Sequence, residues 1–277
     1  MTHYLNCRGK LLDISTPIVM GILNITPDSF YDGGKFSDES NRISAVEKML
    51  TNGAMLIDIG AVSSRPGASE VSVEEEWTRL EPVLKMMNTK FPDAIISLDT
   101  TRAFIAERAL NSGVAIINDI TAGSDPDMFG IVAKHKAPYI MMHMQGMPAN
   151  MQDNPVYDDV TETVLQFFLK KMEEAKKAGI IDIIIDPGFG FGKTIEHNFE
   201  LLKNIGSLKT ILDVPVLAGV SRKSMINKTL GIKAAEALNG TTVLNTIALM
   251  KGASILRVHD VKEAVETTKL FGCYQKA

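Results

Sequence analysis

The chain has 277 residues, of which 45% are hydrophobic and 22% are charged, and its formal net charge is −4. This composition is typical of a globular protein rather than a disordered or fibrous one, and the negative charge offers no electrostatic basis for binding nucleic acid or an anionic membrane. No apolar run reaches the roughly 18 residues of a membrane span, and the first residues lack a signal-peptide core. Cys7 and Cys273 have no metal-binding or disulfide-framework spacing. We therefore expect a cytoplasmic protein.

Short apolar runs recur along the chain, each followed by a stretch of helical periodicity. Near-continuous apolar runs are typical of strands buried on both faces, as in a parallel sheet. The runs cover residues 18–24, 55–60, 94–100, 114–120, 139–144, 181–188, 215–221 and 255–260. Eight such units predict one α/β domain over residues 1–277, a single (β/α)8 TIM barrel. The alternative fold is a doubly wound open sheet.

The segments between the strands carry recognisable helix signals. Residues 3–15 precede the first strand and are predicted to form a hairpin that closes the barrel floor. Residues 39–53 have an apolar period of 3.6 that stops at a glycine. Ser72 and Glu75 have the spacing of a capping box. Residues 159–179 form the longest helical pattern, with lysines gathered near its end, as the helix dipole favours.

Polar residues stand at or near the end of each predicted strand. They are Asn24, Asp58, Asp99, Asn118, His143, Asp186, Ser221 with Lys223, and Arg257 with His259. Any one of them could be a helix cap or a turn former, and for Asp58 a bracing role is as plausible as a binding role. Caps do not require acids, lysine, arginine and histidine at the same end of successive strands, so the set predicts a polar pocket.

The residue types in this set indicate two kinds of ligand group. Asp99, Asn118 and Asp186 are acceptors suited to a flat heterocycle with several N–H donors, and Asp186 could accept two parallel hydrogen bonds from such an edge. Lys223 could donate to a ring carbonyl or nitrogen. A second group suits an anion such as a phosphate. It comprises Asn24, the segment Ser63-Ser64-Arg65, Arg257 and His259.

The stretch IIIDPGFGFGKT, residues 183–194, ends like a nucleotide-binding P-loop. A P-loop needs glycine five positions before Gly192, and that position is occupied by Pro187, which has no N–H to offer a phosphate. The segment is therefore predicted to be a strand and its turn, with Lys193 and Thr194 away from any substrate.

Eight segments stand in an order and context that resemble the dihydropteroate synthases, the folate-pathway enzymes targeted by sulfonamides. They are NITPDSFYDGGKF, SSRPGA, SLDTTR, INDITAG, MHMQGMPANMQ, DPGFGFGKT, GVSRKSMI and RVHDV. The resemblance covers residues 17–261 and implies a (β/α)8 barrel that is usually a homodimer. It implies a transferase that joins 6-hydroxymethyl-7,8-dihydropterin pyrophosphate to 4-aminobenzoate and releases pyrophosphate, with Mg²⁺ present. The implied partners are these small molecules, with no nucleic acid and no membrane.

The resemblance also implies roles for individual residues. The pterin-binding residues would be Asp99, Asn118, Met141, Asp186, Lys223 and Arg257. The pyrophosphate-binding residues would be Asn24, Ser64, Arg65, Arg257 and His259, with Asn24 as the Mg²⁺ ligand. The aminobenzoate-binding residues would be Phe30, Ser64, Arg65, Pro66, Phe189 and Ser224. The catalytic residues would be Arg65, Lys223, Arg257 and His259.

One loop departs from the family pattern. The family commonly reads Gly-Gly-Glu-Ser-Thr-Arg-Pro-Gly, where this chain has residues 60–67, GAVSSRPG. Ser64 keeps the usual hydroxyl without the methyl group, and Val62 replaces an acid. We expect activity to survive these changes.

Other functions compete with this interpretation. They are a non-catalytic pterin-binding barrel, a corrinoid-linked methyltransferase with a related barrel, and a P-loop NTPase. A mere binder would not need the anion-binding set of Asn24, Arg65, Lys223 and His259, and the SSRPGA and SRK segments favour the synthase over the methyltransferase.

Overall fold

A computed structural model describes residues 4–26, 39–63, 71–146 and 151–277. The strands are β1 (Tyr4–Cys7), β2 (Lys10–Asp13), β3 (Ile18–Asn24), β4 (Leu56–Gly60), β5 (Ile95–Asp99), β6 (Ile116–Asp119), β7 (Tyr139–Met142), β8 (Ile183–Asp186), β9 (Leu217–Ala218) and β10 (Ile255–Val258). The α-helices are α1 (Glu39–Thr51), α2 (Val73–Lys90), α3 (Ala103–Asn111), α4 (Met128–His135), α5 (Val160–Ala178), α6 (Ile195–Leu212), α7 (Ser224–Leu230), α8 (Leu238–Met250) and α9 (Val261–Lys276). A 3₁₀ turn, Ala234–Glu236, precedes α8.

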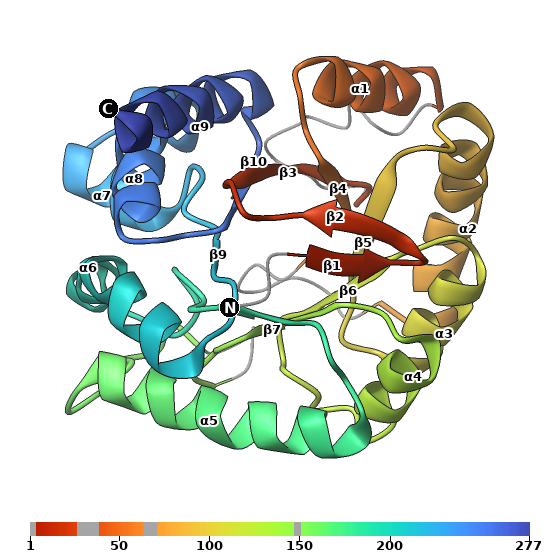
Figure 1. Cartoon of the computed structure of the whole chain (residues 1–277), viewed down its shortest axis with the longest axis horizontal. Coiled ribbons are helices and arrows are strands. Elements are labelled where there is room, and N and C mark those ends of the chain that lie inside the picture. Colours follow the sequence, from red (N-terminus) through yellow and green to blue (C-terminus); the bar gives the residue numbers. More distant parts are fainter. Residues whose placement is uncertain (1–3, 27–38, 64–70, 147–150) are drawn as a thin grey trace.

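Eight parallel strands form the barrel, with the helices in a ring around it (Figure 1). The order is β8-β7-β6-β5-β4-β3-β10-β9. The two ends of this order meet through a parallel bridge between Ile185 and Val216, in which the Ile185 N–H donates to the Pro215 carbonyl at 3.0 Å. The predicted (β/α)8 barrel is thereby confirmed, and the open-sheet alternative is wrong.

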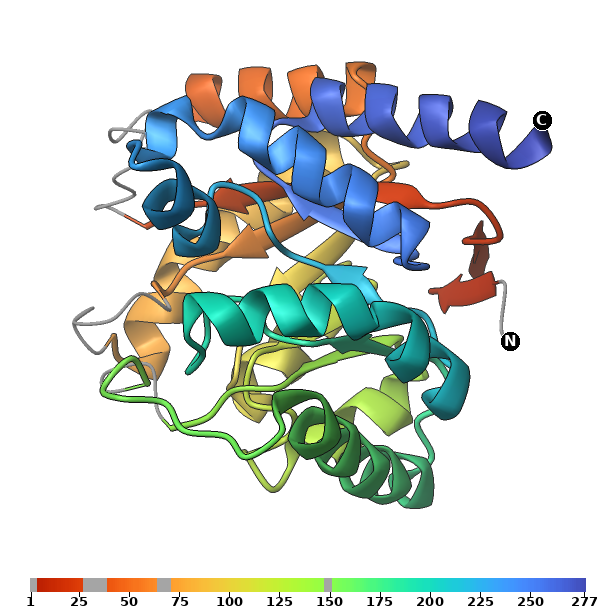
Figure 2. The same ribbon diagram turned by 90° about the vertical axis from the view of Figure 1, so that its left-hand side faces the viewer.

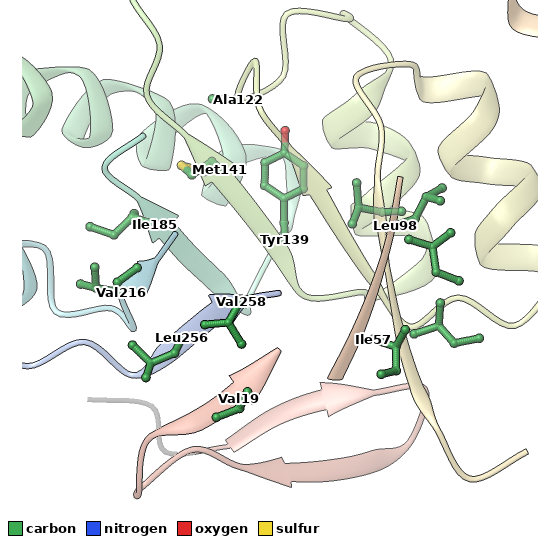
Figure 3. Close-up of a cluster of buried hydrophobic side chains, with 14 of the residues drawn as sticks. Val19, Ile57, Leu98, Ala122, Tyr139, Met141, Ile185, Val216, Leu256 and Val258 are labelled. Atoms are coloured by element: carbon green, nitrogen blue, oxygen red, sulfur yellow. The ribbon is translucent and has the colours of Figure 1, made fainter. Parts of the chain in front are cut away.

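Side chains of the barrel strands alternate between two apolar layers. One layer lies between strands and helices, and Figure 3 shows part of it, including Ile57, Leu98, Tyr139, Met141 and Ile185. The residues next to these in sequence point into the barrel, because successive side chains of a strand face opposite ways. The strands are therefore apolar on both faces, which explains their continuous hydrophobic runs.

The predicted hairpin is present and closes one end of the barrel. β1 and β2 pair antiparallel, and Leu5, Cys7 and Leu12 are buried in a cluster with early residues of the barrel strands, such as Ile18 and Leu56. Figure 2 shows this hairpin and the C-terminus at the same end of the barrel. The hairpin therefore plugs the amino ends of the strands and leaves the carboxyl ends for a site.

The helix signals in the sequence agree with the observed ends to within two residues. The Ser72 hydroxyl accepts from the Glu75 N–H at the start of α2, although the Glu75 carboxylate pairs with Arg79 instead of closing a capping box. Asp159 caps α5, and Gly179 ends it in the left-handed region at φ 100°. None of the helices in the described part of the chain is long and apolar enough to cross a membrane.

Several predicted strands are longer than the observed ones. The largest difference is at residues 215–221, of which only Leu217–Ala218 is strand. The chain leaves the sheet at Gly219 and turns, with the Lys223 N–H donating to the Val220 carbonyl at 3.2 Å. The apolar run continues through this turn because Val220 is still buried.

Candidate active site

A cavity opens at the carboxyl ends of the barrel strands. Its lining residues are Asn24, Thr26, Val62, Ser63, Asp99, Asn118, Ile120, Met142, Asp186, Phe191, Gly219, Lys223 and Arg257. Six of the residues predicted from strand ends are among them, contributed by five strands and the turn before α7. The parallel barrel brings them together because all its strands end on one face.

Arg257 lies between two carboxylates. Its Nε donates to Asp58 Oδ2 at 2.7 Å, and its Nη2 donates to Asp99 Oδ2 at 3.1 Å. Asp58 is fully buried, and its Oδ2 also accepts from Asn118 Nδ2 at 3.0 Å. Asp58 therefore holds two cavity residues, which is the bracing alternative considered for it from the sequence.

The pKa values of Arg257 and Asp99 are both raised, but for different reasons. Burial alone would lower the pKa of Arg257, but Asp58 and Asp99 raise it above the ordinary value, so the guanidinium stays charged. Burial raises the pKa of Asp99 to about 7, against the opposing effect of Arg257 and reinforced by the negative charge of Asp58. Near neutral pH, Asp99 can therefore accept hydrogen bonds as a carboxylate or donate one as an acid.

Asp186 and Lys223 form the opposite wall of the cavity. Asp186 is buried, and its Oδ1 accepts the Gly188 N–H at 2.8 Å. Burial raises the pKa of Asp186, whereas Lys223 lowers it. Burial lowers the pKa of Lys223 to about 8, and Asp186 opposes that shift. Each group thus offsets part of the effect that burial has on the pKa of the other.

Lys223 is also tied to the turn after β8. Its Nζ donates to the Phe189 carbonyl and lies 4.6 Å from the centre of the Phe191 ring. A cation over an aromatic face is electrostatically favourable. Phe191 and Lys223 therefore form one wall that combines an apolar ring with a positive charge.

Glycine keeps open the part of the cavity near Asn24. A Cβ on Gly60 would lie 3.4 Å from Asn24 Oδ1 and 3.6 Å from the Asp99 Cβ. A larger side chain there would fill the space in front of both residues. Gly60, at the carboxyl end of β4, thus leaves space in the cavity and adds no functional side chain to it.

His259 follows β10 and is held by the neighbouring strand end. Its Nδ1 lies 3.0 Å from Ser221 Oγ, and its backbone N–H donates to the same oxygen at 3.2 Å. The next residue, Asp260, pairs with Arg222 through contacts of 2.7 and 2.6 Å. These bonds fix the start of α9, and His259 is not among the residues that line the cavity.

The side chains of Met141 and Phe189, which were predicted to bind substrate, face away from the cavity. Met141 belongs to the apolar layer behind the strands (Figure 3), and its neighbour Met142 lines the cavity. Phe189 is fully buried in the same layer, and Phe191 lines the cavity. In each case the sequence pointed to the correct segment but to a residue whose side chain points away from the cavity.

His143 and Ser221 are buried and are not among the residues that line the cavity, and the other predicted residues are either exposed or undescribed. Ser224 is exposed at the first position of α7, directly after Lys223. Phe30, Ser64, Arg65 and Pro66 lie outside the described residues.

Several cavity residues were not singled out from the sequence. They are Thr26, Ile120, Met142, Phe191 and Gly219. Four of them lie within two residues of a predicted strand end and Phe191 lies three residues beyond one, so strand alternation could have found Met142 but not the loop positions.

The described residues contain no group of three or more His, Cys, Asp or Glu side chains that could hold a metal ion. Asn24, at the end of β3, offers an amide oxygen to the cavity. Mg²⁺ commonly takes few protein ligands and keeps water and substrate phosphates for the rest. The donor set at this position therefore fits a Mg²⁺ ion that is held mainly by a phosphorylated ligand.

Comparison with known proteins points in the same direction as the geometry. The chain matches the family described as pterin binding enzyme over residues 20–259. It is 44% identical to the dihydropteroate synthase of Haemophilus influenzae over 269 residues, which cover 96% of this chain and 97% of that protein. It is 43% identical to the dihydropteroate synthase of Escherichia coli over 265 residues, or 95% of this chain and 93% of that protein.

Solved structures agree at the level of the whole fold. The chain superposes on Yersinia pestis dihydropteroate synthase in a sulfonamide drug complex with a TM-score of 0.95, at 42% identity over 99% of this chain and all of that one. It superposes on Xanthomonas albilineans dihydropteroate synthase with 4-aminobenzoic acid with a TM-score of 0.92, at 37% identity over the full length of both.

Proposed function

The chain belongs to the dihydropteroate synthase family of pterin-binding enzymes, and from this premise we propose how its residues divide the reaction. The enzyme is a transferase of folate biosynthesis. It joins the dihydropterin-CH₂ group of 6-hydroxymethyl-7,8-dihydropterin pyrophosphate to 4-aminobenzoate and releases pyrophosphate. The observation that carries the division of roles is that Asp99, Asn118, Asp186, Lys223 and Arg257 line a single cavity.

The pterin ring lies between the two walls of this cavity. Asp186 accepts from the N–H edge of the ring, because a buried carboxylate favours two parallel charge-assisted hydrogen bonds. Asp99 and Asn118 form hydrogen bonds with the adjoining ring atoms, and Lys223 donates to a ring carbonyl or nitrogen.

The pyrophosphate lies on the Arg257 side. Asp58 and Asp99 take the Nε and Nη2 of Arg257, so Nη1 is directed to the ligand. His259 and Asn24 complete the anion site, together with Ser64 and Arg65 of the loop outside the described residues. Cationic donors at this end favour the departure of a negatively charged group.

Mg²⁺ is the proposed cofactor, held by Asn24 and the phosphates. When bound, it neutralises charge on the pyrophosphate and so assists its departure. The fit of the Asn24 amide to an oxygen-seeking ion supports this assignment.

The protein supplies positioning and electrostatics rather than a covalent nucleophile. As the C–O bond to pyrophosphate weakens, positive charge develops on the dihydropterin methylene, and the ionised Asp186 stabilises it from the ring edge. Arg257 and His259, with Ser64 and Arg65, stabilise the negative charge on the leaving group, and preorganised charges of this kind usually dominate catalysis. The amine nitrogen of 4-aminobenzoate then forms the new C–N bond and loses a proton.

We place 4-aminobenzoate outside the pterin, near the start of α7. Ser224 is exposed there, and the N-terminus of a helix attracts a carboxylate. Phe30, Ser64, Arg65 and Pro66 are assigned to this subsite from their motifs alone. Phe189 is assigned through its segment, in which Phe191 supplies the ring that faces the cavity.

The wider organisation is also a proposal. Residues 1–277 form one domain, and the enzyme acts in the cytoplasm as a homodimer. Exposed apolar side chains of the last helices support the dimer, since Met250, Leu270 and Tyr274 are each at least 60% exposed in the single chain. Light scattering would then give the mass of two chains rather than 30.2 kDa.

One assay tests the function and separates it from its rivals. Release of pyrophosphate should require both 4-aminobenzoate and the dihydropterin pyrophosphate, and ATP should not replace the latter. A pterin-binding protein without catalysis would bind the pterin and release nothing. A corrinoid-linked methyltransferase would show no reaction that depends on 4-aminobenzoate.

A further inference from the structure

Lys193 is a buried lysine that the proposed reaction does not use. It is 3% exposed, yet it comes from the Gly-Lys-Thr sequence that resembles a phosphate-binding loop. Its Nζ lies 3.0 Å from the Gly188 and Phe191 carbonyl oxygens, 3.2 Å from the His143 carbonyl and 3.0 Å from His143 Nδ1. Four acceptors surround an ammonium group that has three N–H donors.

His143 must be neutral to serve as one of these acceptors. It is buried, and burial together with the charge of Lys193 lowers its pKa to about 3. Nδ1 is then the unprotonated nitrogen that accepts from Lys193, and the ring proton lies on Nε2. Burial lowers the pKa of Lys193 to about 7, and the charge of Asp186 opposes that shift. The charged form is solvated by these protein oxygens and the nitrogen in place of water.

This cage closes a loop that fits tightly against the end of β7. A Cβ on Gly188 would lie 1.9 Å from the His143 carbonyl oxygen, and one on Gly192 would lie 2.3 Å from the Gln145 carbonyl oxygen. Tyr157 adds a third tie by donating from Oη to the Gly192 carbonyl at 2.8 Å. The backbone of residues 187–192 therefore folds around Lys193 Nζ at close range.

The same loop builds one wall of the cavity. The Phe189 carbonyl accepts from Lys223, and Phe191 lines the cavity beneath the Lys223 ammonium. The positive charge of Lys193 also lowers the pKa of Asp186, the carboxylate at the start of the loop. Lys193 is thus linked to Lys223 through the loop backbone and to Asp186 through space.

We infer that Lys193 is a positioning residue of the pterin site, a buried ammonium that shapes the loop after β8 and so sets the places of Lys223 and Phe191. The inference rests on the pterin-binding role proposed above. The Lys193 ammonium orders the loop in the way a bound metal ion can, because several carbonyl oxygens lie around its one positive charge. The resemblance to a phosphate-binding lysine ends at the sequence, since Nζ points into its own loop.

The test compares Lys193→Met with the wild-type enzyme in the synthase assay. Methionine keeps the approximate length of the side chain but cannot hold the carbonyl groups. We expect kcat/KM for the dihydropterin pyrophosphate to fall on the order of 100-fold, as for other misplacements of about 1 Å. The KM for this substrate, to which Lys223 donates in the proposed site, should rise more than the KM for 4-aminobenzoate, whose subsite takes only the Phe191 ring from this loop. Tyr157→Phe, which removes one tie and keeps the ring, should shift the same KM in the same direction by less.

Lys209→Met is the matched control. Lys209 also donates to a backbone carbonyl, that of Gly252 at 2.8 Å, but its loop lies at the amino end of the barrel. This variant should lower the melting temperature and leave both KM values unchanged. A folded Lys193→Met enzyme with wild-type KM values would overturn the inference. If Lys193→Met does not fold, an unchanged pterin KM in Tyr157→Phe overturns it instead. Absence of turnover in the wild type would contradict the proposed function rather than this inference.

Discussion

At the scale of single residues, ligand binding in the cavity relies on carboxylates that lie close to cations or N–H donors. Burial raises the pKa of Asp186, and Lys223, the Gly188 N–H, Arg257 and Lys193 all oppose that effect. Arg257 is held by Asp58 and Asp99 in a comparable way. The ligand therefore meets charges that are already oriented, which reduces the cost of arranging them during the reaction.

Asp186→Asn should weaken pterin binding strongly. The amide would present N–H donors to the donor edge of the ring and would lose the charge, a change worth roughly 1.5–3 kcal/mol for a hydrogen bond to a charged group. Calorimetry with a pterin ligand measures the effect as a rise of about 10- to 100-fold in Kd.

Asp182→Asn provides the comparison for this prediction. Asp182 lies just before β8, and its Oδ2 accepts the Asn6 N–H of the hairpin at 2.8 Å. Its variant should bind pterin normally. Equal affinity in both variants would refute the role of Asp186.

The charge of Lys223 should appear in the pH dependence of the reaction. Its pKa is lowered to about 8, so the ammonium is present below that pH and is lost as the pH rises through it. We expect kcat/KM, which reports the free enzyme, to fall above about pH 8. In Lys223→Arg the surviving activity should not fall there, because arginine stays protonated. A basic limb at the same pH in this variant would assign the titration to another group.

At the scale of elements, Lys193 and Thr194 of the Gly-Lys-Thr sequence have different roles in the turn between β8 and α6. Lys193 faces the loop, whereas Thr194 starts the helix. The Thr194 hydroxyl accepts the His197 N–H at 3.2 Å, and His197 Nδ1 accepts the Thr194 N–H at 3.3 Å. This reciprocal cap uses the N–H groups that a P-loop would offer to phosphate.

Thr194→Ala should therefore cost stability and leave substrate recognition intact. Loss of an N-cap hydroxyl lowers the free energy of unfolding by about 0.5–2 kcal/mol, which denaturant titration can measure. The pterin KM should change far less than in Lys193→Met.

In addition, ATP should not raise the melting temperature of the wild type. Stabilisation by ATP that is lost in Thr194→Ala would reopen the P-loop interpretation.

At the scale of the whole molecule, the two ends of the barrel have different tasks. The hairpin β1-β2 buries Leu5 and Leu12 against the amino ends of the strands, and the cavity lies at the carboxyl ends. The barrel interior between them is packed, as in other (β/α)8 proteins. Stability and catalysis can therefore be changed separately.

Leu5→Ala should destabilise the barrel without altering the site. Leu5 is 1% exposed, and truncation of a buried leucine costs about 2–5 kcal/mol. Thermal unfolding should detect the loss, while both KM values stay at wild-type levels. Leu11→Ala is the control on the same hairpin, since Leu11 is 67% exposed and its loss should change little. A raised pterin KM in Leu5→Ala would mean that the plug and the site are coupled.

The amino-acid sequence alone sufficed for the features that repeat locally. Apolar runs and the stretches between them predicted the number and order of strands, the hairpin and the ends of α5, because burial on two faces and helix capping depend on residues near in sequence. The polar residues after the strands predicted the position of the site, because parallel strands of a barrel end together.

Tertiary structure alone resolved the contacts that no local pattern contains. Asp58 and Arg257 pair across 199 positions of sequence, and Lys193 finds its acceptors in its own loop and 50 positions away at His143. The choice of Met142 over Met141 follows from the phase of strand alternation, which is the direction each side chain takes once the barrel is closed. A continuous apolar run carries no such phase, because both of its faces are buried.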